Sequence, residues 1–299
     1  MPKLITVGEV IDRSWEHYRK FFLDLMSISG WLLLLAAFEI ASLIFFPTST
    51  KLLTGGGLDG SESFGVILFT ISSYVIAPLL GIWTLAALVR LISQQLGKTK
   101  VNLRKAMQEG WQFFLPTLVV SLLVALVLIA GIAIGVGPGF LLALLAVGVN
   151  NTSLLIIANL LVAVGIFVAL VLNIRWSVNY IMTPYALLVE NYRGTSALTR
   201  SHNMIRGKFL NILVLILVPK VVFILFGIAA MFVLGYIVNL LLSIPIGLNI
   251  DLQLRLFSMT SSIISIVVAA LINPLIIIAD VLIYNSLKDR AAERRRESK

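Results

Sequence analysis

Six ionisable residues interrupt the long apolar runs of this sequence, and their positions make them the first candidates for chemistry. They are Asp24, Glu39, Arg90, Arg175, Lys220 and Asp280. A charge within an apolar run is costly to bury, so it needs a partner, and such residues often mark a path for protons, ions or solutes. The alternative is that they form structural ion pairs, because no series of acidic or histidine residues follows them along one helical face.

Lys220 has the deepest expected position of the six. It follows Pro219 in LVPKVVF and lies twelve residues after Lys208, which corresponds to about 18 Å along a helix. Pro78, Pro219 and Pro274 could each interrupt a helix and free backbone groups that line a polar cavity. The possible counter-ions of Lys220 are Asp24, Glu39 and Asp280.

Arg90 and Asp280 share an expected depth. Each precedes a lysine by eight residues, Lys98 and Lys288 respectively, so each should lie about 12 Å from the edge of the apolar layer. An ion pair between Arg90 and Asp280 would therefore satisfy both charges.

Motifs for enzymes and metal sites are absent from the sequence. It has no cysteine and only two histidines, His17 and His202, which excludes thiolate sites and makes a histidine metal cluster unexpected. A phosphate-binding P-loop, a GxSxG nucleophile motif and an HExxH zinc motif are also missing. We therefore expect no catalytic residue and no cofactor.

The composition identifies the solvent of this chain. Its mean hydropathy is +1.02 and only 12% of its residues are charged, whereas a soluble domain carries about 25%. The apolar runs are continuous rather than alternating, and within lipid such runs must pair their backbone amides as helices. The sequence predicts an all-α integral membrane protein.

Apolar runs of sufficient length predict six membrane spans, since about 20 residues cross a bilayer. They are 23–47, 64–93, 115–135, 154–182, 209–236 and 259–287. Two further apolar stretches, 136–149 and 237–248, are too short to span again, and the conformation of the second is open as far as residue 258. They are either helix extensions or re-entrant hairpins.

Lysine and arginine residues are distributed very unequally between the expected loops. If both termini are cytoplasmic, nineteen of the 23 lie on the cytoplasmic side, and only Lys51 and Arg255 lie outside. The positive-inside rule therefore predicts cytoplasmic N- and C-termini. The same distribution explains the net charge of +9 without nucleic acid, because a nucleic-acid partner would require one basic footprint.

Three amphipathic segments precede the odd-numbered spans: VGEVIDRSWEHYRKFF, VNLRKAMQEGWQFF and TSALTRSHNMIRGKF. Each places apolar residues on one helical face and charges on the other, and we expect them to lie at the membrane surface. Together with a second landmark at the ends of the even-numbered spans, they predict a threefold repeat of an interfacial helix and a two-span hairpin. The repeat units are about 1–98, 99–194 and 195–289 of a single transmembrane domain, followed by a basic tail, 290–299.

The cations of these helices and of the tail are candidate contacts for anionic lipid headgroups, each contributing about 1 kcal/mol near such a surface. They are Arg13, Arg104, Lys105, Arg200, Arg206, Arg294, Arg295 and Arg296. Two alternatives remain open for these helices: they only connect spans, or they dock a cytosolic protein.

The pattern of polar segments resembles a known family. VGEVIDRSWEHYRKFF, RWSVNY and VENYRGTSALTRSHNMIRGKF are similar to segments of the membrane domain found beside bacterial glycerophosphoryl diester phosphodiesterases, and of its stand-alone six-span relatives of uncharacterised function. The matching residues are Ser14, Trp15, Arg175, Trp176, Glu190, Ala197, Leu198, Ser201 and Gly207, whereas His202 stands where the pattern has Trp. The resemblance implies a six-span protein of a prokaryotic cytoplasmic membrane. It does not imply phosphodiesterase activity, which belongs to a separate barrel of about 250 residues.

Three functions are compatible with these observations. The first is a non-enzymatic role in membrane or lipid homeostasis through the basic interfacial helices. The second is a small-solute transporter or channel with Lys220 near its path. The third is a membrane-embedded lipid-modifying enzyme, which no sequence motif supports.

Overall fold

The computed structural model describes residues 4–48, 51, 55–97, 102–207, 209–242 and 250–297, and this part of the chain is helical without any strand. Six helical segments are long and apolar enough to cross a membrane. They are Phe22–Phe45, Gly60–Leu96, Phe114–Gly148, Thr152–Glu190, Phe209–Leu241 and Leu252–Glu293. The expectation of an all-helical, multi-pass membrane protein is confirmed.

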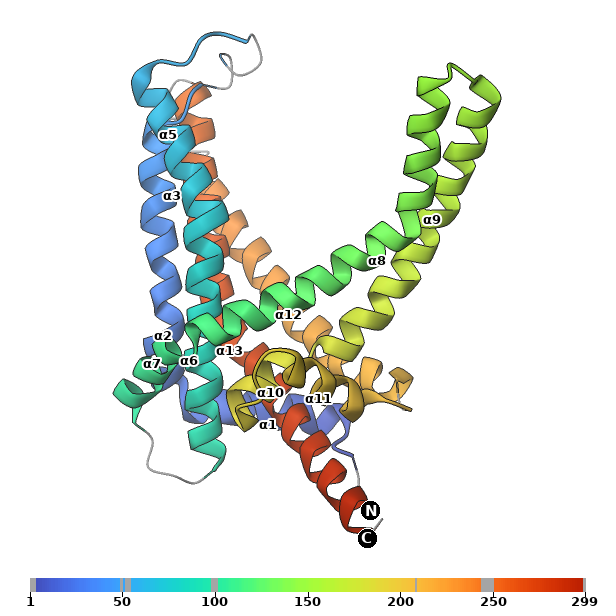
Figure 1. The fold of residues 1–299 in the computed structure, drawn as a ribbon. Helices are drawn as coiled ribbons and strands as arrows, with labels where there is room; N and C mark the ends of the chain where they lie inside the picture. Colours follow the sequence, from blue (N-terminus) through green and yellow to red (C-terminus); the bar gives the residue numbers. More distant parts are fainter. Residues whose placement is uncertain are drawn as a thin grey trace. The chain divides into compact units, whose positions relative to one another are not determined.

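The helices follow one another as shown in Figure 1. In chain order they are α1 (Val7–Lys20), α2 (Phe22–Ser29), the 3₁₀ turn η1 (Gly30–Leu32), α3 (Leu33–Phe45), α5 (Gly60–Ile71), the π-helical turn η2 (Ser72–Ile76), α6 (Ala77–Leu96), α7 (Leu103–Gln112), α8 (Phe114–Gly148), α9 (Thr152–Tyr180), α10 (Thr183–Glu190), α11 (Thr195–Ile205), α12 (Phe209–Leu242) and α13 (Ile250–Glu297). The first two spans each combine several of these pieces: α2, η1 and α3 form one, and α5, η2 and α6 form the other.

The chain divides into two compact units. One consists mainly of Leu115–Val214 and Ser286–Lys299, and the other of Lys3–Phe114 and Leu215–Asn285. This grouping differs from the repeat units expected from the sequence, because α12 contributes mostly to the unit that contains α1 to α7. The threefold repeat stays a prediction.

Local signals set the beginnings of the short helices. Thr6 and Glu9 form a capping box at α1, and the Asn102 side chain accepts a hydrogen bond from the backbone N–H of Lys105 at α7, at 3.0 Å. Helix α11 begins at Thr195, after the N-cap Gly194, whose φ is +55°. The Ser196 hydroxyl, inside the first turn, donates to the carbonyl of Arg193, at 2.6 Å.

The extra apolar stretches extend helices where the structure describes them. Helix α8 runs without interruption to Gly148, so 136–148 is an extension and not a hairpin. Helix α12 likewise continues to Leu242, whereas residues 243–249 lie outside the described part. Pro219 and Pro274 do not break their spans, since they lie inside continuous helices. Pro78 does coincide with an irregularity, because it lies at the start of α6, directly after the π-helical turn η2.

Glycines hold α8 and α9 together in the first unit, where the two helices form an antiparallel hairpin (Figure 1). A Cβ added to Gly135 would lie 2.5 Å from the carbonyl oxygen of Gly165, and one added to Gly139 would lie 2.6 Å from the backbone nitrogen of Val162. A Cβ added to Gly131 would lie 2.9 Å from Asn173 Nδ2 and 3.1 Å from Trp176 Cζ3. The GxxxG spacing of 131, 135 and 139 thus marks a close helix contact, as such spacing does in membranes.

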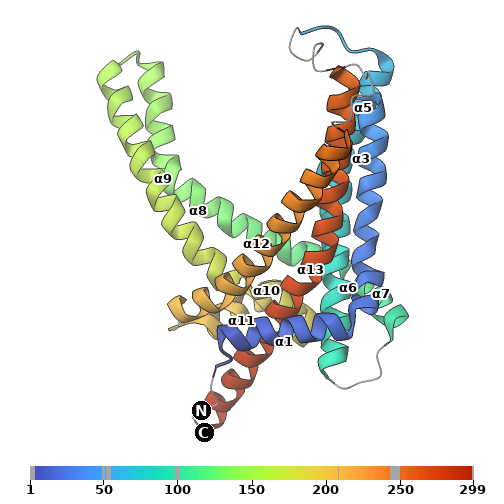
Figure 2. The ribbon, with the colours of Figure 1, turned by 180° about the vertical axis from the view of Figure 1, so that it is seen from behind.

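The second unit is built around α6 and the first 36 residues of α13, Ile250–Asn285. Figure 2 shows α13 beside α3 and α6. The Ser29 hydroxyl donates to the Ala270 carbonyl, and Arg255 Nη1 donates to the Ile44 carbonyl at 3.0 Å. Helix α13 therefore contacts the first span, Phe22–Phe45, in its first third and near its C-terminal end. On the other side of α6, the small size of Gly110 allows α7 to contact Ala87, with 2.8 Å from an added Cβ to the Ala87 Cβ.

Candidate functional site

Lys220 and Asp280 form an ion pair between α12 and α13. The Lys220 Nζ lies 2.9 Å from Asp280 Oδ2, and the exposed fractions of the two side chains are 23% and 4%. The helices approach closely at Gly227, where an added Cβ would lie 3.1 Å from Ile272. Of the three counter-ions that the sequence allowed for Lys220, the structure selects Asp280.

The expected Arg90–Asp280 pair is corrected, because each residue has another partner. Arg90 Nε lies 3.9 Å from Glu109 Oε2 of α7, and its guanidinium carbon lies 3.9 Å from the centre of the Phe113 ring. The sequence placed Arg90 and Asp280 at a similar expected depth, but it did not show which face of α6 carries Arg90. That face is turned toward α7, and Glu109 is a partner that the sequence did not suggest.

Asp24, Glu39 and Arg175 are not brought to Lys220. Asp24 and Glu39 are half-buried, and Arg175 is exposed near the end of α9. Among the described residues none of the three takes part in an ion pair. Asp24 lies in the first turn of α2, where a negative charge is favoured by the helix dipole.

Four of the candidate lipid-contacting cations are exposed: Arg13, Arg104, Lys105 and Arg206. Arg13 lies 3.7 Å from Glu9 and Lys105 lies 3.9 Å from Glu109, each one turn away on its own helix. Such exposed pairs contribute only about 0.3–0.5 kcal/mol, so these cations can exchange partners. Helix α13 includes positions 294–296, but the side chains of Arg294, Arg295 and Arg296 lie outside the described part.

Arg200 differs from the other four, because it is held by Glu190 of α10. Its Nε lies 3.0 Å from Glu190 Oε2 and its Nη2 lies 3.1 Å from Oε1, a two-point contact in which the Arg200 side chain is only 13% exposed. One residue later, the Ser201 hydroxyl donates to the Asn179 carbonyl at 2.7 Å. Arg200 and Ser201 therefore fasten α11 to the end of α9 and to α10.

The two cations on the expected outer side are both engaged within the protein. Lys51 Nζ lies 2.9 Å from Asp59 Oδ2 and 2.9 Å from Glu62 Oε2. The carboxylate neighbours raise the pKa of Lys51 above its ordinary value, chiefly through the hydrogen bond to Glu62. Arg255 donates to the backbone at the end of α3, with 3.0 Å to the Ile44 carbonyl oxygen.

His17 connects α1 to α6. Its Nε2 lies 2.7 Å from Gln95 Oε1, and the amide oxygen requires the imidazole to donate. Burial lowers the pKa of His17 below 6.5; the hydrogen bond to Gln95 acts in the opposite direction, and the charge of Lys20 lowers the pKa further. His17 is thus held in its neutral form by its position under α6.

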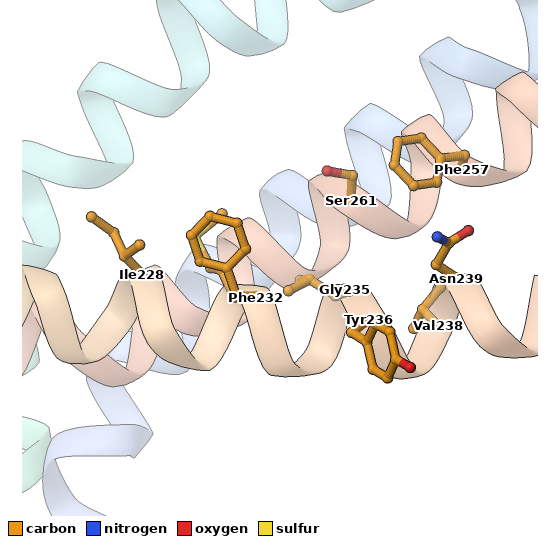
Figure 3. A pocket seen from close by; sticks show the side chains of 10 residues that line it. Ile228, Phe232, Gly235, Tyr236, Val238, Asn239, Phe257 and Ser261 are labelled. Carbon is orange, nitrogen blue, oxygen red and sulfur yellow. The ribbon is translucent and has the colours of Figure 1, made fainter.

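A groove of about 550 Å³ lies between the C-terminal half of α12 and the N-terminal half of α13. Figure 3 shows the rings of Phe232 and Phe257 reaching into it, with Asn239 pointing toward Phe257. Sequence reasoning missed this site. Its signal was the polar pair Tyr236 and Asn239 in an otherwise apolar run, but a groove also requires the two helices to diverge, which one sequence does not show.

Comparisons with protein-family models, curated proteins and solved structures found no match. Among the described residues there is also no group of three or more His, Asp or Glu side chains that could hold a metal ion. The arrangement of the chain's own residues therefore carries the functional argument.

Proposed function

We propose that this chain is a non-enzymatic membrane protein of lipid homeostasis, which binds anionic headgroups through α1, α7 and α11. The observation that carries the proposal is a contrast between cations. Arg13, Arg104, Lys105 and Arg206 are exposed on or beside the short helices, and Arg13 and Lys105 keep 61% and 65% of their side chains exposed despite their pairs with Glu9 and Glu109. In contrast, the outer cation Lys51 is 35% exposed between two carboxylates, and Arg255 donates to backbone carbonyls. Exposed cations at a membrane surface attract anionic headgroups by about 1 kcal/mol each.

The orientation favours the same conclusion. With cytoplasmic termini, these four cations face the leaflet that carries anionic lipids in most cell membranes, and nineteen of the 23 lysine and arginine residues lie on that side. The location that we propose is the cytoplasmic membrane of a prokaryote. The opposite faces of α1, α7 and α11 pack against other parts of the protein, because Ser14 and Ser201 are fully buried and Gly110 contacts Ala87.

Lipid counting in nanodiscs tests this proposal. The protein is placed in nanodiscs with equal amounts of phosphatidylglycerol and phosphatidylcholine, released into detergent, and its retained lipids are counted by native mass spectrometry. The variant carries four neutral residues: Arg13→Gln, Arg104→Gln, Lys105→Gln and Arg206→Gln. Its matched control keeps every charge: Arg13→Lys, Arg104→Lys, Lys105→Arg and Arg206→Lys.

We expect the native protein and the charge-conserving control to retain phosphatidylglycerol preferentially. The neutral variant should lose this preference by about ten-fold or more, because four contributions of about 1 kcal/mol are removed. Equal retention of both lipids by the native protein would overturn the proposal.

A second candidate function, transport of a small solute, is favoured by the Lys220–Asp280 pair. An ion pair between two spans is a common element of substrate and proton paths. Here Lys220→Met should change solute flux in proteoliposomes when the flux is divided by the amount of folded, reconstituted protein, with Arg175→Met as a control for loss of another charge in a span. An unchanged flux per folded protein would make the pair structural.

A further inference from the structure

The groove between α12 and α13 has the shape of a ligand site. The helices touch where Gly227 meets Val268 and Ile272, at 3.4 and 3.1 Å from an added Cβ. Beyond this point a space of about 550 Å³ opens between them, which falls within the range of about 300–1,000 Å³ that small-molecule sites occupy. Phe232 and Tyr236 line the groove and are strongly exposed, at 74% and 67%. The groove is therefore open to the surroundings of the protein along the side of α12.

The lining changes from apolar to polar along the groove. The end near the helix contact is lined by Ile228, Met231 and Ile264, which have no hydrogen-bonding side-chain groups. At the far end, the Asn239 amide is directed toward Phe257, and Tyr236 also lines the groove (Figure 3). An occupant that matches this lining is apolar at one end and has hydrogen-bonding groups at the other.

The direction of this change agrees with the depth of the residues in a bilayer. Ile228 and Asn239 lie 19 and 30 residues after Phe209, which corresponds to about 28 and 45 Å along the helix. With a tilt of about 20°, and a bilayer of about 30 Å of hydrocarbon within about 40–45 Å in total, Ile228 lies in hydrocarbon and Asn239 at the headgroups. The polar end of the groove therefore lies at the surface opposite the basic helices.

The described polar end of the groove contains no charged side chain. None of the ten lining residues is Asp, Glu, Lys, Arg or His. The nearest cation along α13 with a described side chain is Arg255, whose Nη1 already donates to the Ile44 carbonyl. An anionic headgroup finds no free cation among the described residues here, so the groove suits a lipid whose headgroup is uncharged or zwitterionic.

We propose that the groove binds one acyl chain of a zwitterionic glycerophospholipid in the outer leaflet. The chain lies along Met231 and Phe232, and the ester groups accept hydrogen bonds near Tyr236, Asn239 and Ser261. This inference goes beyond the proposed function, because it concerns the other leaflet and uses none of the basic helices. A water-soluble solute does not suit the groove, because the lining is mainly apolar and open to the hydrocarbon.

Gly235 provides a direct test, since it lines the groove and a Cβ added there meets nothing within 4 Å. The Cβ of Gly235→Leu therefore displaces no neighbour, and the rest of the side chain adds bulk at the groove. Gly137 of α8 is the matched control, because it also has nothing within 4 Å and does not line the groove. Asn239→Leu is the second variant: it leaves the apolar end intact and removes a polar group at the headgroup level.

The probe is phosphatidylcholine with a photoreactive diazirine in its acyl chain, incorporated into nanodiscs with the full chain. After irradiation, labelled peptides are quantified by mass spectrometry. We expect labelling concentrated on Met231, Phe232 and Ile264, reduced at least five-fold in Gly235→Leu, reduced less in Asn239→Leu, and unchanged in Gly137→Leu. Thermal unfolding of each variant in detergent confirms that it is folded.

Four results would contradict the proposal. Labelling spread evenly over all apolar helices would show ordinary surrounding lipid. Equal labelling in native protein and Gly235→Leu would place the chain elsewhere. Crosslinks between the α12 helices of two chains, with no lipid label, would show that a second copy covers the groove. A phosphatidylglycerol probe that labels the groove as strongly as phosphatidylcholine would overturn the headgroup preference.

Discussion

The ammonium group of Lys220 lies 2.9 Å from Oδ2 of Asp280. This contact joins α12 to α13 through two residues that are 60 positions apart in the sequence. Both groups lie within segments that are apolar enough to cross a membrane. Each charge is therefore tolerable only while the other is present. The loss of stability should therefore be larger when one partner is replaced than when both are replaced by apolar residues.

We predict that Asp280→Asn and Lys220→Met each destabilise the protein by about 3–5 kcal/mol, because each leaves one uncompensated buried charge. The double variant Lys220→Met with Asp280→Leu should recover most of this loss, since apolar replacements of a buried pair are often neutral. The measurement is the midpoint of thermal unfolding in detergent. Additive effects of the two single changes would show that the residues do not act as a pair.

The contact between α8 and α9 gives a second prediction with a control in the same helix. Gly135→Ala should destabilise the hairpin by about 1–3 kcal/mol, as overpacking does, because the new Cβ would lie 2.5 Å from the Gly165 carbonyl oxygen. Gly137→Ala, two residues away, meets nothing within 4 Å and should be neutral or slightly stabilising. Fluorescence-detected size exclusion after heating compares the two variants. Equal losses would contradict the close approach at Gly135.

The two-point contact of Arg200 with Glu190 gives a third prediction. Arg200→Lys keeps the charge but cannot reproduce the paired hydrogen bonds at 3.0 and 3.1 Å, because an ammonium group lacks the planar fork of a guanidinium. We expect Arg200→Lys to lower the thermal midpoint measurably, and Arg206→Lys, at an exposed position, to leave it unchanged. Limited proteolysis at the connection between α10 and α11 should increase in the first variant alone.

Elements with local signals could be predicted from the sequence. The six spans follow from run length and composition, and the beginnings of α1 and α7 follow from the Thr6–Glu9 capping box and from Asn102. The glycine spacing of 131, 135 and 139 likewise identified a close helix contact, because the distance between helices depends directly on side-chain size at the interface.

Features that depend on which helix faces which could not be predicted. Residue spacing gives an expected depth for Arg90 and Asp280 but not the rotation of α6 about its axis, so the pair expected between them was wrong. Arg200 was grouped with exposed cations because its own helix shows only a polar face, whereas Glu190 lies on the preceding helix. The groove at Gly235 required the divergence of two helices, which leaves no pattern in one sequence.

The pKa of His17 leads to a final prediction, on the pH dependence of α1. Burial lowers this pKa below 6.5, its value for a solvated imidazole, so below pH 6.5 a detached α1 binds more protons than the docked helix does. Docking is therefore fully favourable above pH 6.5 and weakens as the pH falls toward the lowered pKa, by at most about ten-fold per pH unit. Amide hydrogen exchange, corrected for its intrinsic pH dependence, should show protection of α1 decreasing between pH 7 and 5.5. Helix α7, which contains no histidine, should not change. His17→Gln should remove the pH dependence of α1, and an unchanged dependence in that variant would assign it to another group.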